Sequence, residues 1–320
     1  MFNPSGGLDL FRPTAHQSSQ KRLGSLVTNG IVARKDEVTA MSVGVFLAVL
    51  FAALLHATWN ALVKISADRL VLLAVLKIAT TVVAVVSLPF VTMPPTEAWP
   101  YIAASVVIHT AYFLFLTIAY RFGDLSQVYP LSRGVAPLIV AGLAVFVLGE
   151  TLGPQALVAL LLISFGIMSM IFSGKGAAGQ PKAVAAALAT GCFIAGYTVA
   201  DGAGARLSGD AQSYLMWLNV LNGIPIILIA AVRRPGTLVP QLRLVWKAGA
   251  LSAIVSLLAY WIVLWASTQA PVALVAAVRE VSMVFAVIFG VVFLKEKLEL
   301  RKMLSIFVTL SGIVLLRASK

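Results

Sequence analysis

Long apolar runs, separated by short polar gaps, follow one another from Met41 to the end of the 320-residue chain. An α-helix needs about 20 mostly apolar residues to cross the hydrocarbon core of a bilayer. The pattern predicts ten such helices, at residues 42–66, 70–90, 98–121, 125–149, 153–173, 182–205, 212–232, 245–268, 271–294 and 300–318. Because backbone groups in lipid must be satisfied internally, we expect an all-α polytopic membrane protein and not a β-barrel.

Residues 1–40 differ from the rest of the chain. They are polar, rich in Gly, Ser and Gln, and lack the apolar core of a signal peptide. This composition predicts a disordered N-terminal extension. Because Met41 immediately precedes the first apolar run, a protein that starts at Met41 is an equally good interpretation.

Charge is sparse and dispersed. Hydrophobic residues make up 60% of the chain and charged residues 11%, less than half the fraction typical of soluble domains. The net charge of +12 comes from Lys and Arg spread over the gaps, so we expect a lipid bilayer as partner and no nucleic acid. The gaps after the odd-numbered helices hold most of these residues, which predicts that those gaps are cytoplasmic and both termini outside. The five basic residues within 1–40 and the basic C-terminus favour the opposite orientation.

The fourth and ninth predicted helices share an internal repeat. Arg133 precedes Glu150 by 17 residues, and Arg279 precedes Glu296 by the same distance. The same shift of 146 residues relates Leu148 to Leu294, Gly166 to Gly312 and Ile167 to Ile313. The chain therefore divides into two five-helix units, at residues 41–174 and 181–318. Because five is odd, the second unit enters the membrane from the opposite side, giving the inverted repeats typical of secondary transporters.

Three segments carry a family resemblance. The stretches "YPLSRGVAPLIVAGLAVFVLGETL" and "VREVSMVFAVIFGVVFLKEKL" resemble the two EamA domains of the drug/metabolite transporter superfamily. The stretch "LLHATWNALVKIS" resembles the first helix of that family. The resemblance implies a ten-helix transporter with a central cavity, exporting small metabolites, amino acids or xenobiotics.

Arg133, Arg279 and Glu280 are charged residues that lie well inside apolar runs. An ionisable side chain at the centre of a membrane helix costs about 2.5–3.5 kcal/mol, so each is a functional hypothesis. Both arginines lie about eight residues, or roughly 12 Å, inside their helices. We expect them to face the interior near the midplane and to contact substrate. The alternative is that a structural acid neutralises them, for which Glu280 is the candidate.

Further candidates form polar or aromatic stripes on three helices. His56, Trp59 and Asn60 are spaced by three and four residues, so they share a helix face that we expect to line the cavity. Tyr112 and Tyr197 are aromatic candidates, although aromatic residues at helical spacing more often pack against other helices. Asp201 follows Tyr197 by one turn. We expect Glu150 and Glu296, which stand at helix ends, to be structural.

These features predict a secondary transporter in the inner membrane that exports a small polar metabolite by alternating access. The paired arginines favour a substrate with an anionic group. If transport is coupled to protons, the candidates are Glu280, Asp201, His56 and His109. The alternatives are an integral-membrane enzyme, a channel or a receptor. The sequence shows no HExxH, GxSxG or paired aspartates, no Walker loop and no metal-site spacing, so we expect neither catalysis nor a cofactor.

Overall fold

The protein is described by a computed structural model that covers residues 41–66, 69–122, 125–173, 181–233, 238–295 and 299–318. These residues belong to one compact unit, Ala40–Lys320. The expectation of disorder for residues 1–40 falls outside the described residues, as does the expectation for Glu296.

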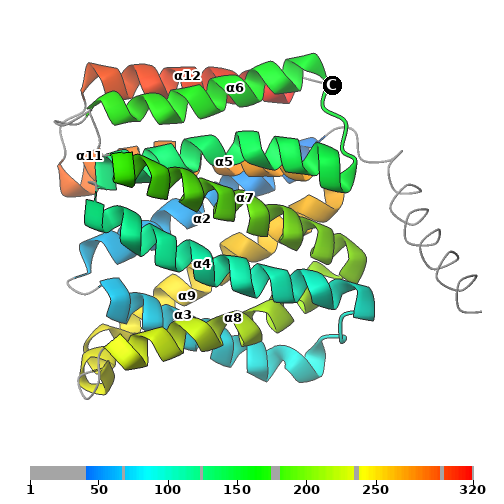
Figure 1. Cartoon of the computed structure of the whole chain (residues 1–320), viewed down its shortest axis with the longest axis vertical. Helices are drawn as coiled ribbons and strands as arrows, with labels where there is room; N and C mark the ends of the chain where they lie inside the picture. The colour runs from blue at the N-terminus through cyan, green and yellow to red at the C-terminus, as the bar shows by residue number, and fades with distance from the viewer. Residues whose placement is uncertain are drawn as a thin grey trace, which may run out of the picture. The chain divides into compact units, whose positions relative to one another are not determined.

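The described residues form helices throughout, joined by short connections (Figure 1). The α-helices are α2 (Val43–Ile65), α3 (Arg69–Ser87), α4 (Trp99–Phe122), α5 (Leu125–Leu148), α6 (Pro154–Ser169), α7 (Pro181–Ser208), α8 (Ala211–Arg233), α9 (Leu238–Gln269), α10 (Val272–Arg279), α11 (Ser282–Leu294) and α12 (Leu300–Ala318). Three short 3₁₀ helices are η1 (Leu88–Phe90), η2 (Thr96–Ala98) and η3 (Met170–Ser173). The all-helical prediction is confirmed.

Within the described ranges, eight segments are long and apolar enough to cross a membrane, with α10 and α11 together forming one of them. The helix α6 is apolar but shorter, with 16 residues. Two helix ends illustrate how the helices begin and end. At the start of α2 the Ser42 hydroxyl accepts a hydrogen bond from the Val45 amide. After α5, Gly149 has a φ of 64°, which turns the chain.

Helices of the first half, α2–α6, pack mainly against helices of the second half, α7–α12. The first helix of each half packs against the third helix of the other half, so that α2 contacts α9 and α7 contacts α4. Each first helix also contacts the other half's fourth span, α7 on α5 and α2 on α10 and α11. The second helices α3 and α8 contact each other. This reciprocal pattern is the two-repeat architecture expected from the sequence.

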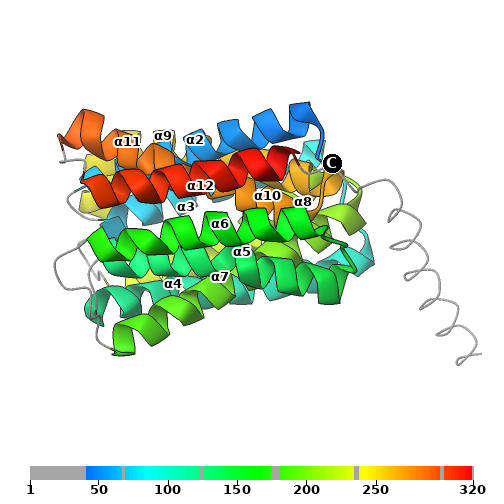
Figure 2. The same ribbon diagram turned by 90° about the horizontal axis from the view of Figure 1, so that it is seen from above.

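The last helices of the two halves, α6 and α12, lie side by side at one edge of the bundle (Figures 1 and 2). The backbone of α12 approaches α6 at Gly166, where an added Cβ would meet the Thr309 amide nitrogen at 2.7 Å. The reciprocal approach is at Gly312, where an added Cβ would meet the Ile163 amide nitrogen at 2.9 Å. Both glycines therefore allow α6 and α12 to pack closely.

Two predicted helices differ from the observed ones. The eighth begins at Leu238 and not at residue 245, because Pro240 falls in the first helical turn, where a missing N–H breaks no helical hydrogen bond. The ninth, predicted as one helix over 271–294, is divided into α10 and α11. The amide of Glu280 bonds to the carbonyl of Ala277, and Val281 to Val278, which is 3₁₀ geometry.

Replacing Gly166 by alanine should destabilise the bundle. The new Cβ would collide with backbone atoms of α12, and overpacking of this kind costs about 1–3 kcal/mol. The matched control is Gly142→Ala in α5, where nothing lies within 4 Å and alanine is the better helix former. Thermal unfolding of the purified protein in detergent compares the two. Equal stability of both variants would contradict the packing role of Gly166.

Candidate functional site

Arg133 of α5 and Glu280 of the second half form a buried ion pair. The Arg133 Nε lies 2.9 Å from the Glu280 Oε2, and the two residues are 4% and 1% exposed. The Nη2 of Arg133 also donates a hydrogen bond to the Ser282 hydroxyl, at 3.3 Å. Because a lone buried charge is costly, the carboxylate is what allows Arg133 to sit here. The neutralising role considered for Glu280 is confirmed, and it acts on the arginine of the other half.

Arg279, at the last position of α10, is buried to the same degree but is less well bonded. Its Nη2 donates to the Thr198 hydroxyl of α7 at 3.5 Å, the outer limit of a hydrogen bond. Its Nε has no hydrogen-bond partner among the described residues. A guanidinium carries five N–H donors and no acceptor. Arg279 therefore presents a buried cation whose donors are largely unused.

Aromatic rings stand beside Thr198. Tyr197 stacks on His109 of α4, with ring centroids 4.0 Å apart and an interplanar angle of 22°. Tyr112, also on α4, lies 5.8 Å from Tyr197 in an edge-on arrangement. Tyr197 is buried, whereas His109 and Tyr112 are half-buried. The structure thus brings both predicted tyrosines together, one residue along α7 from the partner of Arg279.

Asp201 lies one helical turn after Tyr197 and Thr198, and it is 1% exposed. Its carboxylate accepts a hydrogen bond from the Tyr214 hydroxyl of α8 at 2.9 Å and another from the Tyr260 hydroxyl of α9. The ring of Tyr260 also meets His109 edge-on. Asp201 is therefore held by two tyrosines of the second half, one of which contacts His109 of the first half.

The predicted polar face of α2 is only partly joined to this cluster. His56 interacts electrostatically with both Arg133 and Arg279. Trp59 packs edge-on against His56, with ring centroids 5.1 Å apart. The side-chain amide of Asn60 donates to the His56 carbonyl at 2.7 Å, a contact within its own helix. His56 is thus linked to the site through the electrostatic interaction with the two arginines, whereas the described contacts of Trp59 and Asn60 are with His56.

Sequence reasoning missed three hydroxyl-bearing contacts, Thr198, Ser282 and Tyr214. Thr and Ser are common in membrane helices, where they usually bond to the carbonyl four residues earlier, as Thr198 does to Ile194. Their presence alone does not mark a site. For Tyr214 the available signal was a polar tip in an apolar run, which predicts a hydrogen-bond partner without identifying it.

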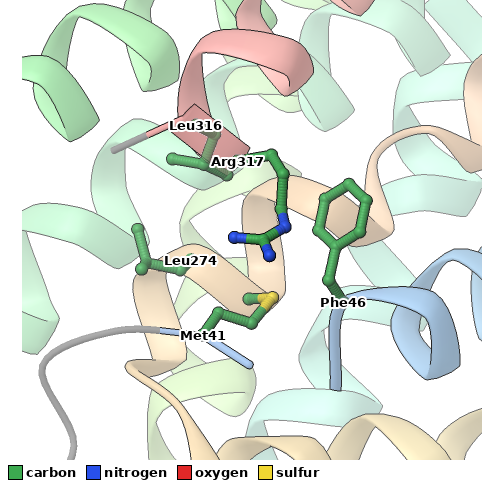
Figure 3. Close-up of a pocket in the computed structure, with 5 residues that line it drawn as sticks. All are labelled: Met41, Phe46, Leu274, Leu316 and Arg317. Atoms are coloured by element: carbon green, nitrogen blue, oxygen red, sulfur yellow. The ribbon is translucent and has the colours of Figure 1, made fainter. Parts of the chain in front are cut away.

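Figure 3 shows a pocket that lies among the described residues. It is lined by Met41, Phe46, Leu274, Leu316 and Arg317, so it lies between the start of α2, α10 and the end of α12. The Arg317 guanidinium stands 6.0 Å from the centre of the Phe46 ring. None of the predicted site residues lines it. The described residues contain no group of three or more His, Cys, Asp or Glu side chains that could hold a metal ion.

Replacing Glu280 by glutamine should destabilise the protein strongly. Arg133 would keep its charge and lose its counterion, and breaking a buried pair in this way costs about 3–5 kcal/mol. The double variant Arg133→Gln/Glu280→Gln removes both charges and should lose less stability than the sum of the single variants. Thermal unfolding of the four proteins completes the cycle, with Glu97→Gln, an exposed acid, as control. Additive losses would show that the two charges are not coupled.

The model of the EamA-like transporter family matches twice, at residues 42–172 and 181–318. No curated protein matches. Among 29 matching chains of solved structures, one described only as the crystal structure of a protein has 16% sequence identity and a TM-score of 0.66. The match covers 85% of this chain and 94% of that one, which supports the fold alone. Because the family model covers both halves, this chain belongs to the EamA-like transporter family, within the drug/metabolite transporter superfamily.

Proposed function

We propose that this protein is a secondary transporter of the inner membrane that exports a small polar metabolite carrying an anionic group. The observation that carries the proposal is Arg279, a buried guanidinium with one long hydrogen bond, next to the neutralised pair of Arg133 and Glu280. A carboxylate or phosphate oxygen of the substrate supplies the acceptors that Arg279 lacks, in a region where charge-assisted hydrogen bonds are strong. The outward direction follows from the resemblance to exporters.

The position of the cluster supports alternating access. Arg133 belongs to the first half, whereas Glu280, Arg279 and Thr198 belong to the second. Tyr112 and His109 of the first half face Tyr197 of the second. A ligand held here contacts both halves at once, so a rocking motion of one half against the other changes its access to either side of the membrane. A static enzyme site has no need of this division between halves.

Replacing Arg279 by glutamine should reduce transport about 10- to 100-fold. Hydrogen bonds to charged groups contribute about 1.5–3 kcal/mol, and each 1.4 kcal/mol corresponds to a factor of ten. Purified protein is first screened by thermal shift against amino acids, phosphonates, sugars and cationic drugs, and each hit is assayed for flux in proteoliposomes. Arg317→Gln, at a helix end outside the cluster, serves as control. Unchanged flux in Arg279→Gln would assign this arginine to structure, and ligand-stabilised protein without any flux would contradict transport.

Asp201 is the residue to test for proton coupling. Of the two candidate acids, Glu280 forms an ion pair with Arg133. The Asp201 carboxylate has no cationic partner within 4 Å in the described part of the chain, and it accepts hydrogen bonds from tyrosine hydroxyls instead. We expect an imposed pH gradient to stimulate flux of the wild-type protein and to leave flux of Asp201→Asn unchanged, while both bind ligand in the thermal-shift assay. Stimulation that persists in Asp201→Asn would exclude Asp201 as the coupling residue.

A further inference from the structure

Glu150 connects the two halves at one end of the bundle. It follows α5 of the first half, and its carboxylate accepts hydrogen bonds from three donors of the second half. These are the Arg206 Nη2 at 2.8 Å, the Val272 amide at 2.7 Å and the Ala273 amide at 3.3 Å. The structural role expected for Glu150 is therefore confirmed, and its partners are more specific than the sequence indicated.

Arg206 completes this contact from the end of α7. Its Nε donates to the Ser267 carbonyl at 2.7 Å, and its Nη2 donates to the Ala270 carbonyl at 3.0 Å. The cation thus lies at the C-terminal end of α9, while the anion of Glu150 lies at the N-terminal end of α10. Each charge faces the helix end whose dipole attracts it. We call this group of Glu150, Arg206 and the α9–α10 corner the end contact.

The helix α10 joins the end contact to the candidate site. Its first two residues donate their amides to Glu150, and its last residue is Arg279, followed directly by Glu280. The helix has eight residues, all buried, which corresponds to about 12 Å. At its other end the chain changes to 3₁₀ hydrogen bonds before α11. Such a turn within a span is a common hinge, so α10 is able to move separately from α11.

We propose that the end contact closes the transport pathway on the side of the membrane opposite the basic loops. Glu150 belongs to the first half and its partners to the second, so the halves separate on this side only when its three hydrogen bonds break. Through α10 the same movement shifts Arg279 and Glu280, which couples closure to occupancy of the site. This proposal rests on the proposed transport function. It names the residues that close one side of the transport pathway.

The test joins the two halves covalently beside the end contact. The single natural cysteine is first replaced, as Cys192→Ser. Thr151→Cys and Gln269→Cys then place thiols on exposed positions that flank the contact and leave its charges intact. Bifunctional thiol reagents of increasing length are reacted with the protein in proteoliposomes. We expect the shortest reagent that joins the thiols to reduce flux at least tenfold. Protein joined by longer, flexible reagents should show progressively higher flux.

Each single-cysteine variant treated with the same reagents is the control and should keep its flux. Undiminished flux in protein shown to be joined by the shortest reagent would overturn the closure. Ligand binding, measured by thermal shift, should survive joining. Failure of the proposed transport function would give a different result from failure of the closure. The untreated protein would then transport none of the ligands that stabilise it.

A second variant tests the charge of the end contact without any reagent. Glu150→Gln keeps the shape of the side chain and weakens its bonds to Arg206 and to the α10 amides. We expect turnover per folded protein to fall at least tenfold, with ligand affinity changed less than threefold. A static cap predicts another outcome, in which thermal stability falls and turnover of the remaining folded protein equals that of the wild type. That outcome would also overturn the proposal.

Discussion

The ion pair of Arg133 and Glu280 is the interaction on which the centre of this protein depends. A guanidinium inside the hydrocarbon region is tolerated only with a counterion or a water-filled surrounding, and here the counterion comes from the other half of the chain. The pair therefore ties α5 to the turn between α10 and α11. The hydroxyl of Ser282, on the same side of that turn, adds a second bond. Arg133 can consequently be buried only when the two halves pack correctly against each other.

Both arginines lie where a backbone hydrogen bond of the helix is missing. Pro137 has no N–H and stands four residues after Arg133, so the Arg133 carbonyl has no helical donor. In the second half the interruption has another cause, since the amide four residues after Arg279 belongs to Met283 and donates to the Glu280 carbonyl. Weakened helical bonding at the same repeat position allows each span to bend where it carries its charge. The fourth span of each half can therefore bend at its arginine, although a proline causes this in the first half and a 3₁₀ turn in the second.

Much of this arrangement could be predicted from the sequence, because it depends on spacing along the chain. The repeat of Arg133 and Arg279, and of Gly166 and Gly312, is visible as a fixed shift and implies equivalent positions in two similar units. The partner of Glu280 was not predictable, since its neighbour Arg279 and the distant Arg133 are equally suitable by charge. The division of the ninth span was missed for a related reason. The break itself contains neither Gly nor Pro, and it coincides with Glu280, whose partner Arg133 is distant in the sequence.

The two repeated arginines end in different situations, and this asymmetry follows from the single acid between them. Glu280 forms its ion pair with Arg133, whereas the described hydrogen-bond partner of Arg279 is a neutral hydroxyl, and the other buried acid, Asp201, is bound by tyrosine hydroxyls. A second acid at the equivalent position of the first half would have paired with Arg279, but Gly134 occupies that position and packs closely against α6. Close packing at Gly134 and an unpaired charge at Arg279 are therefore linked. The two arginines are equivalent in the repeat and differ at one neighbouring residue, which is why the proposed ligand contact is assigned to Arg279 and not to Arg133.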